Sequence, residues 1–200
     1  SDINCSFFDH IISANRLLRK EFGFNQTTES MLNLASNAIE EVLSKEEDPL
    51  CVVLGFGEMG RKAVEVLLLQ GQENITVFSR DPKTASQRDI ELSSRINILS
   101  FNQWEEQDIM PSLIISTIRN IEPTFNSSNI IPISRPVKIM DFSWPPSIES
   151  SGINGQQELL GMEYWIKVAH KLGVEWDYEN TILRSEELIS NIEKKFMSAL

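Results

Sequence analysis

The sequence is poor in the residues that build disulfide frameworks, metal centres and nucleic-acid surfaces. Two cysteines and two histidines among 200 residues are too few for a disulfide scaffold or a Cys/His metal cluster, and this cysteine usage is typical of a reducing cytoplasm. The 18 basic residues are outnumbered by 29 acidic residues, which gives a net charge of -11. Because proteins that bind nucleic-acid phosphates need clustered lysine and arginine, we expect no direct nucleic-acid binding.

Long hydrophobic runs are also missing. No apolar stretch approaches the roughly 18 residues needed to cross a bilayer, so we expect no membrane segment and a cytoplasmic location. The hydrophobic and charged fractions, 41% and 24%, are ordinary for a folded protein. We predict three parts: a helical linker over residues 1–48, a Rossmann domain over 49–160, and C-terminal helices over 161–200 that pack on the domain or form a dimer.

From residue 50 onward, predicted strands alternate with predicted helices. Short apolar runs indicate strands over 51–54, 74–78, 96–99, 113–116 and 137–140, with an edge strand over 157–160. Between them we expect helices over 61–70 and 82–95, a helical turn around Trp104 and a loop over 120–136. Further helical stripes occur over 5–22, 31–43, 163–172 and 178–197. Strands joined by helix-length crossovers favour an α/β fold with a doubly wound parallel sheet.

A glycine motif follows the first of these strands. It directly precedes a predicted helix, which is the context that a G-x-G-x-x-G motif requires. In such a motif Gly55 permits a tight turn, Gly57 lets a pyrophosphate approach the backbone, and Gly60 allows close packing of helix on strand. The alternative is a glycine-rich turn that binds nothing. We predict a dinucleotide site formed by Gly55, Phe56, Gly57, Glu58, Met59 and Gly60.

The residues after the second strand indicate which dinucleotide binds. About 20 residues beyond the glycines, an NAD site carries an acidic residue for the ribose 2′-hydroxyl. This sequence has Ser79 and Arg80 there, followed by Lys83. A guanidinium is a permanently charged, bidentate partner for a 2′-phosphate, so these three residues predict NADP. In the alternative interpretation Arg80 is an ordinary solvated charge at a strand end.

Two later strand ends carry further candidate contacts. Ser116 and Thr117 close the fourth predicted strand, where a doubly wound sheet places the nicotinamide half of its cofactor. Asp141 ends the fifth strand and is expected to face the same crevice. All three residues are equally explained as capping or turn residues.

The sequence offers no convincing catalytic group. Cys51 lies inside the first predicted strand and is expected to be a small core residue. Cys5 begins a helix with no histidine nearby to activate it. His10 and His170 are far apart and have no carboxylate or cysteine at ligand spacing. We therefore assign no catalytic residue and no metal ligand.

The order of these signals resembles glutamyl-tRNA reductase, the NADPH enzyme that makes glutamate-1-semialdehyde for tetrapyrrole (porphyrin) synthesis. The best match is residues 52–60, where the family shows an apolar strand followed by G-x-G-E-M-G. Residues 75–80 resemble a strand ending in Asn-Arg-Thr, although Ser79 and Asp81 depart from it. Weaker matches are Ser116-Thr117 to a Ser-Thr-Gly stretch, with Ile118 for the glycine, 138–145 to an Asp-x-Pro strand end, and 8–30 to the family's linker.

The resemblance implies an NADPH-binding domain that lacks the rest of the enzyme. The family's catalytic cysteine lies in Thr-Cys-Asn-Arg-x-Glu, which does not occur here, and its C-terminal dimerisation region is absent or reduced to the helices after Tyr164. The chain is then either part of a larger enzyme, with an upstream or separate catalytic domain, or a stand-alone relative.

Three functions follow as hypotheses. The first is a hydride-donating NADPH domain of the glutamyl-tRNA reductase type. The second is a stand-alone NAD(P)-dependent oxidoreductase that acts on a tetrapyrrole precursor, as the related precorrin-2 dehydrogenases do, or on a carbonyl or imine. The third is a non-catalytic cofactor-sensing or assembly subunit that pairs through its helices, for example as a homodimer.

Overall fold

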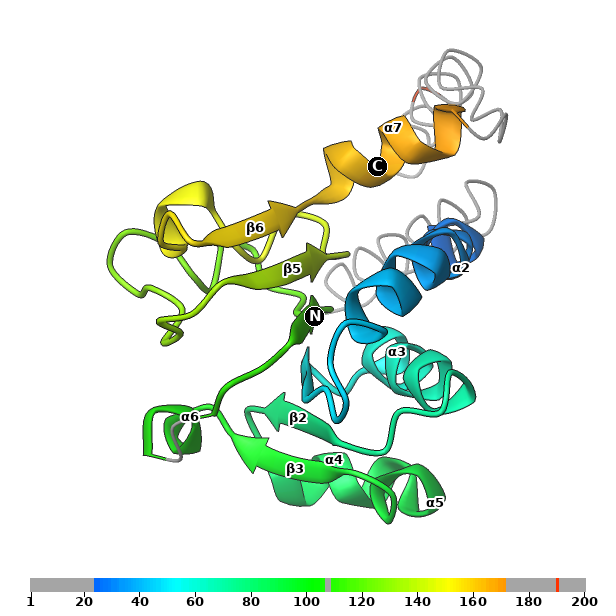
Figure 1. Ribbon diagram of the computed structural model, residues 1–200, viewed down its shortest axis with the longest axis vertical. Coiled ribbons are helices and arrows are strands. Elements are labelled where there is room, and N and C mark those ends of the chain that lie inside the picture. The colour runs from blue at the N-terminus through cyan, green and yellow to red at the C-terminus, as the bar shows by residue number, and fades with distance from the viewer. Residues whose placement is uncertain (1–23, 107–108, 172–189, 191–200) are drawn as a thin grey trace, which may run out of the picture.

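The computed structural model describes residues 24–106, 109–171 and 190 of the chain. The predicted helices over 5–22 and 178–197 lie outside these residues, apart from Ser190. One six-stranded sheet has the order β3-β2-β1-β4-β5-β6, and every neighbouring pair is parallel (Figure 1). The strand order reverses between β1 and β4, the kind of switch point at which open α/β sheets bind ligands. The predicted doubly wound parallel sheet is confirmed.

The strands are short and lie close to their predicted positions. They are β1 (Cys51–Leu54), β2 (Ile75–Ser79), β3 (Asn97–Ser100), β4 (Leu113–Ser116), β5 (Val137–Asp141) and β6 (Gln157–Leu160). The described helices are α2 (Phe24–Leu43), α3 (Glu58–Leu69), α4 (Pro82–Arg88), α5 (Ile90–Ser93), α6 (Asn102–Glu106), α7 (Met162–Lys171) and the 3-10 turn η1 (Ser150–Gly152).

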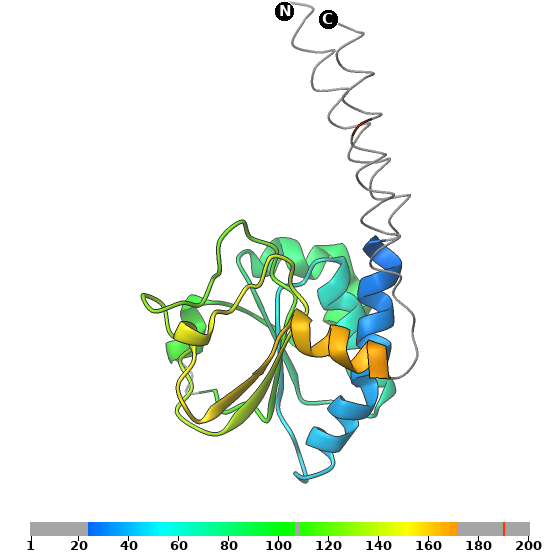
Figure 2. The ribbon, with the colours of Figure 1, turned by 90° about the horizontal axis from the view of Figure 1, so that it is seen from above.

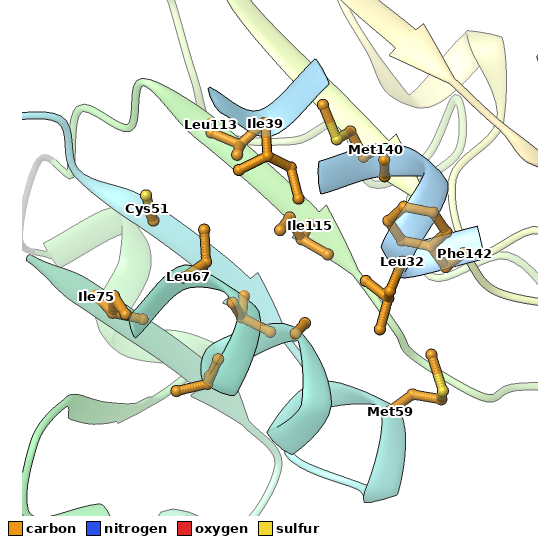
Figure 3. Packing of buried hydrophobic residues seen from close by; sticks show 14 of the residues in the cluster. Leu32, Ile39, Cys51, Met59, Leu67, Ile75, Leu113, Ile115, Met140 and Phe142 are labelled. Carbon is orange, nitrogen blue, oxygen red and sulfur yellow. The ribbon is translucent and has the colours of Figure 1, made fainter. Parts of the chain in front are cut away.

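Helices cover one face of the sheet. Alternate strand residues such as Cys51, Val53 and Ile115 point to this face, because side chains along a strand alternate between its two sides. They pack against α2, α3 and α7, and Figure 2 shows these helices on one side of the sheet. Leu32 of α2 and Leu67 of α3 are buried among the strand residues (Figure 3). This layer holds the larger of the two hydrophobic clusters.

Loops and the short helix α6 cover the opposite face. Trp104 of α6 stacks on Phe78 of β2, with ring centroids 4.5 Å apart. The predicted loop over 120–136 connects β4 to β5 without a helix and buries Phe125, Ile131 and Ile133 against this face. The long connection is therefore part of the core.

Helix α2 is packed as part of the sheet domain. Its residues Leu32, Ala35 and Ile39 belong to the same buried cluster as Cys51 and Val53 of β1 (Figure 3). Helix α2 therefore packs directly on the sheet, while the predicted division at residues 48 and 160 stays a prediction.

The helix that follows β2 is shorter than predicted. Asp81 caps its first turn by accepting from the Thr84 N–H at 3.0 Å, with Pro82 at the first helical position. The predicted helix over 82–95 is interrupted at Asp89, which leaves the helical conformation and caps α5 by accepting from the Leu92 N–H. A second capping aspartate thus splits one predicted helix into two. Among the described residues, no helix has the length and apolar character needed to cross a membrane.

Candidate functional site

The first glycine of the motif makes the turn that leaves β1. Gly55 has a φ of +93°, a conformation that side-chain-bearing residues rarely adopt, and its N–H donates to the Phe78 carbonyl at 2.8 Å. The chain then turns into α3. A Cβ built on Gly60, in the first turn of α3, would lie 2.0 Å from the Gly55 carbonyl oxygen. Helix and strand can approach this closely only because residue 60 has no side chain.

The middle glycine borders open space. A Cβ built on Gly57 would meet no atom within 4 Å. Gly57 is the N-cap of α3 and offers no side chain to accept from the N–H groups of the first turn. These donors lack partners within the helix, and the helix dipole makes this end positive. The start of α3 therefore presents unpaired donors, positive potential and free space, the combination that binds phosphate groups.

Thr117, immediately after β4, fastens the glycine loop from the neighbouring strand. Its N–H donates to the Leu54 carbonyl at 2.9 Å, and its hydroxyl donates to the same oxygen at 3.0 Å. The hydroxyl also lies 3.4 Å from the Gly55 carbonyl. Since its proton is committed to backbone oxygens, Thr117 positions the loop, and only its lone pairs are left for a ligand.

A cavity of about 420 Å³ lies beside this loop. Its walls come from the ends of β1, β2 and β4 and from α4. The lining residues are Gly55, Phe56, Gly57, Glu58, Met59, Ser79, Arg80, Asp81, Thr84, Ala85, Arg88, Phe101, Thr117, Ile118, Arg119, Asn120 and Thr124. Of the predicted site residues, the cavity brings together Gly55, Phe56, Gly57, Glu58, Met59, Ser79, Arg80 and Thr117. Gly60, Lys83, Ser116 and Asp141 are not part of its wall.

The acid that follows Arg80 is occupied by helix capping. Both carboxylate oxygens of Asp81 accept from Thr84, one from its N–H and the other from its hydroxyl. The hydroxyl bond, and then the backbone bond, hold the pKa of the Asp81 carboxyl below its ordinary value. Asp81 is therefore ionised at neutral pH and turned toward its own helix, which leaves Arg80 as the group free to meet a ligand at this strand end.

Sequence reasoning missed two arginines of the cavity wall. Arg88 comes from the last turn of α4 and Arg119 from the segment after β4, and both join Arg80. All three side chains are exposed, and within the described residues none of them pairs with an acidic side chain. Three unpaired guanidiniums face two carboxylates, those of Glu58 and Asp81. A sequence signal existed only for Arg88, which lies four residues after Thr84 on one face of a short helix.

Two of the predicted site residues, Ser116 and Asp141, are buried at the carboxyl ends of β4 and β5. The Asp141 carboxylate is 2% exposed and accepts from the N–H groups of Ser143, Ser147 and Ile148 and from the Ser147 hydroxyl, at 2.8–3.1 Å. The Ser116 hydroxyl lies 2.6 Å from that of Ser147. All these hydrogen bonds are internal to the chain, so the geometry favours the alternative in which Asp141 organises a turn.

The described residues contain one cysteine, which is buried, and no metal cluster. Cys51 is buried in β1 as predicted. Burial, with a smaller contribution from the Glu46 carboxylate, raises the pKa of its thiol to about 12. No group of three His, Cys, Asp or Glu side chains that could hold a metal occurs in the described part of the chain. Cys5 and His10 lie outside the described residues.

The residues of the cavity fit a dinucleotide. The uncapped start of α3 and the open space at Gly57 suit a pyrophosphate. The arginines suit a further anionic group, and Phe101 and Ala85 add apolar surface to the same wall. Glu58 can donate only through its backbone N–H, because a carboxylate is an acceptor.

Comparison with known proteins finds related sequences. A sequence model of the family described as Shikimate / quinate 5-dehydrogenase matches residues 33–159, from α2 to β6. Glutamyl-tRNA reductase from Sulfolobus acidocaldarius is 23% identical over 141 residues, which are 70% of this chain and 32% of that protein. The enzyme of the same name from Saccharolobus islandicus is 22% identical over 152 residues, 76% of this chain and 33% of that protein. The chain thus spans about a third of these curated relatives.

Solved structures show the same fold. Glutamyl-tRNA reductase from Methanopyrus kandleri superposes with a TM-score of 0.55 at 17% identity, covering 84% of this chain and 44% of that one. The nucleotide-binding domain of the Thermoplasma volcanium enzyme gives a TM-score of 0.53 at 13% identity, covering 78% of this chain and 96% of that domain. The predicted resemblance to glutamyl-tRNA reductase is confirmed.

Substitutions at Gly57 and Gly60 should affect cofactor binding and folding stability differently. We expect Gly57→Val to abolish dinucleotide binding while changing the free energy of unfolding by about 1 kcal/mol at most, since an N-cap valine is a poor cap but meets no atom. Gly60→Ala should lower that free energy by about 1–3 kcal/mol or more, because its Cβ overlaps the Gly55 carbonyl. Urea unfolding and fluorescence titration measure the two effects.

Gly155→Val is the matched control for this experiment. Its Cβ also meets nothing within 4 Å, and Gly155 is not part of the cavity wall. Normal binding by the Gly57 variant would show that the glycine loop is not the site.

The Cys51 thiol should be inert in the folded protein. At pH 8 a thiol with a pKa of about 12 is ionised in about one molecule in ten thousand, and only the thiolate reacts. In a Cys5→Ser variant we expect Ellman's reagent to detect no fast-reacting thiol until the protein is unfolded in guanidinium chloride, when one should appear. Rapid labelling of the folded variant would contradict the assignment of Cys51 to the core.

Proposed function

Because this chain belongs to the Shikimate / quinate 5-dehydrogenase family, whose fold and glycine loop are those of NAD(P)-binding oxidoreductase domains, we propose that it binds NADPH and presents it for hydride transfer. The finer proposal is a cofactor domain of the glutamyl-tRNA reductase type, acting in tetrapyrrole synthesis. Cofactors of this kind carry the hydride chemistry, whereas the protein binds and orients them.

One observation carries the proposal. The uncapped N-terminus of α3 and three unpaired arginines line a single cavity at the switch point of the sheet. The α3 N–H groups would hold the pyrophosphate, and Gly57 leaves room for it. Unpaired guanidiniums in a chain of net charge -11 are best explained by an anionic ligand, since acidic partners for them are abundant elsewhere on the chain.

The choice of NADP over NAD rests on the end of β2. An NAD site needs a free carboxylate here to accept from the 2′-hydroxyl. The nearest acid, Asp81, is instead bound to Thr84. Arg80 offers a fork that matches a 2′-phosphate. Ser79 lines the same wall, and its hydroxyl donates to the Asp81 carbonyl at 3.3 Å. Lys83 is not part of the wall, so its predicted role is confined to long-range attraction.

The substrate-binding part is proposed to come from elsewhere. The cavity wall contains no Cys, His, Lys or Tyr side chain that could serve as nucleophile or proton donor. The curated relatives are about three times as long as the matched segment. We therefore propose that this domain works with a catalytic domain that is upstream in the same protein or on a separate chain. Dimer formation and a cytoplasmic location stay predictions.

The family match favours a second candidate. Residues 33–159 match a family described by shikimate and quinate oxidation, so a small hydroxylated carboxylate is the alternative substrate. The two candidates differ in whether a thioester-forming thiol is required, and a turnover assay separates them.

NADPH should bind more tightly than NADH. Arg80→Ala should weaken NADPH binding by about 1.5–3 kcal/mol, the range for a hydrogen bond to a charged group, and should leave NADH binding nearly unchanged. The enhancement of nicotinamide fluorescence on binding gives both dissociation constants. Arg95→Ala is the matched control, because Arg95 is exposed and outside the cavity wall. Equal affinities, or tighter NADH binding, would overturn the NADP assignment.

This chain by itself should bind NADPH but not reduce glutamyl-tRNA. The reaction of the family needs an activated thiolate, and Cys51 is buried with a pKa of about 12. The assay follows NADPH consumption with charged tRNA, for the wild type and for a variant with both cysteines replaced by serine. Robust cysteine-dependent turnover would contradict the proposal that a separate catalytic domain is needed. Reduction of NADP by shikimate or quinate in the same assay would support the second candidate.

A further inference from the structure

Two hollows share one pair of arginines. A more open hollow of about 830 Å³ adjoins the cavity, and Arg80, Arg119 and Asn120 line both. The rest of the outer hollow consists of Ile121, Glu122 and Pro123. No residue of the glycine loop contributes to it. Arg80 and Arg119 therefore stand where the two hollows meet, away from the place that the glycine loop prepares for a pyrophosphate.

The two arginines reach this place from opposite sides of β1. Arg80 follows β2 and Arg119 follows β4, and the sheet order places β1 between these strands. Neighbouring strands lie 4.7–4.9 Å apart, so the two strand ends are separated by about 10 Å. Extended arginine side chains from both ends can therefore converge on one anion above the carboxyl edge of the sheet.

The backbone around Arg119 is fastened on both sides. Before it, the Thr117 N–H donates to the Leu54 carbonyl at 2.9 Å. After it, the Asn120 amide donates to the Thr124 hydroxyl at 2.8 Å. These bonds fix where the Arg119 side chain begins, and thereby limit the positions that its guanidinium can reach. Within the described residues neither Arg80 nor Arg119 is paired with an acid.

We propose that Arg119 is the second arm of a two-arginine clamp that, with Arg80, selects the 2′-phosphate of NADP. This inference rests on the proposed function and adds a specificity-determining residue to it. A pyrophosphate belongs to the glycine loop, whereas the clamp faces both hollows and thus marks a separate anion position. Over both hollows three carboxylates, Glu58, Asp81 and Glu122, accompany three arginines, so the clamp depends on direct contacts of the two guanidiniums with the phosphate and not on an excess of positive charge.

The test compares dissociation constants for NADPH and NADH in Arg119→Ala, Arg80→Ala, the double variant and Arg95→Ala as control. We expect Arg119→Ala to weaken NADPH binding by roughly 10- to 150-fold, the equivalent of one charged hydrogen bond, with NADH binding changed less than about threefold. The double variant should show no preference between the two cofactors. Adenosine 2′,5′-bisphosphate and AMP, used as competitors, isolate the 2′-phosphate from the nicotinamide half.

Each outcome decides between separate claims. If the wild type prefers NADPH and Arg119→Ala keeps that preference, the clamp is wrong and the proposed NADPH function stands. If Arg119→Ala weakens NADPH and NADH equally, Arg119 serves the pyrophosphate and the clamp is again wrong. A wild type without any preference would overturn both the NADP assignment and the clamp. Thermal unfolding of every variant shows whether a loss of binding comes from loss of the fold.

Discussion

The close approach of α3 to the end of β1 is the constraint on which the whole site depends. A side chain at residue 60 would place its Cβ 2.0 Å from the Gly55 carbonyl oxygen, a distance that real structures do not tolerate. With glycine there, the helix starts directly over the strand end, and its free N–H groups open onto the cavity. Thr117, at the end of β4, reaches across to the Leu54 and Gly55 carbonyls of this turn. The anion site is thus a consequence of backbone packing.

A second constraint holds the other side of the switch point. Asp141 ends β5 and uses both carboxylate oxygens on the turn that follows, while Ser147 in that turn contacts Ser116 at the end of β4. A buried carboxylate is costly unless it is fully hydrogen-bonded, and this one accepts four hydrogen bonds. The ends of β4 and β5 are therefore held together by hydrogen bonds made within the chain, whereas the cavity is lined from the ends of β1, β2 and β4 and from α4.

The sequence predicts what is encoded locally. The buried strands and the glycine motif depend on residues that are close together in the sequence, and the sequence analysis predicts both. The parallel, doubly wound sheet follows from such signals through general rules of α/β folds. The split at Asp89 was missed because a capping aspartate inside a polar segment does not interrupt a hydrophobic pattern.

The parts of the site that could not be predicted are those that tertiary packing brings together. Arg119 has no motif around it and reaches the cavity only because β4 lies beside β1. Asp141 is the reverse case, since its strand-end position is compatible with a ligand contact or with a turn. Its hydrogen bonds to the backbone of residues 143–148 depend on where that segment turns, and spacing alone does not reveal them.

Net charge illustrates the same division between local and global properties. A chain of charge -11 is a poor partner for an extended polyanion, yet its cavity concentrates three arginines. The two statements are compatible because salt screens exposed charges over about 10 Å at 0.1 M ionic strength. An anion inside the cavity therefore senses the guanidiniums of its wall together with Glu58 and Asp81, and little of the acidic surface beyond. The hydrogen bonds from Thr84 turn the Asp81 carboxylate toward its own helix without removing its charge. The local balance is therefore three arginines against two carboxylates, which the composition of the whole chain conceals.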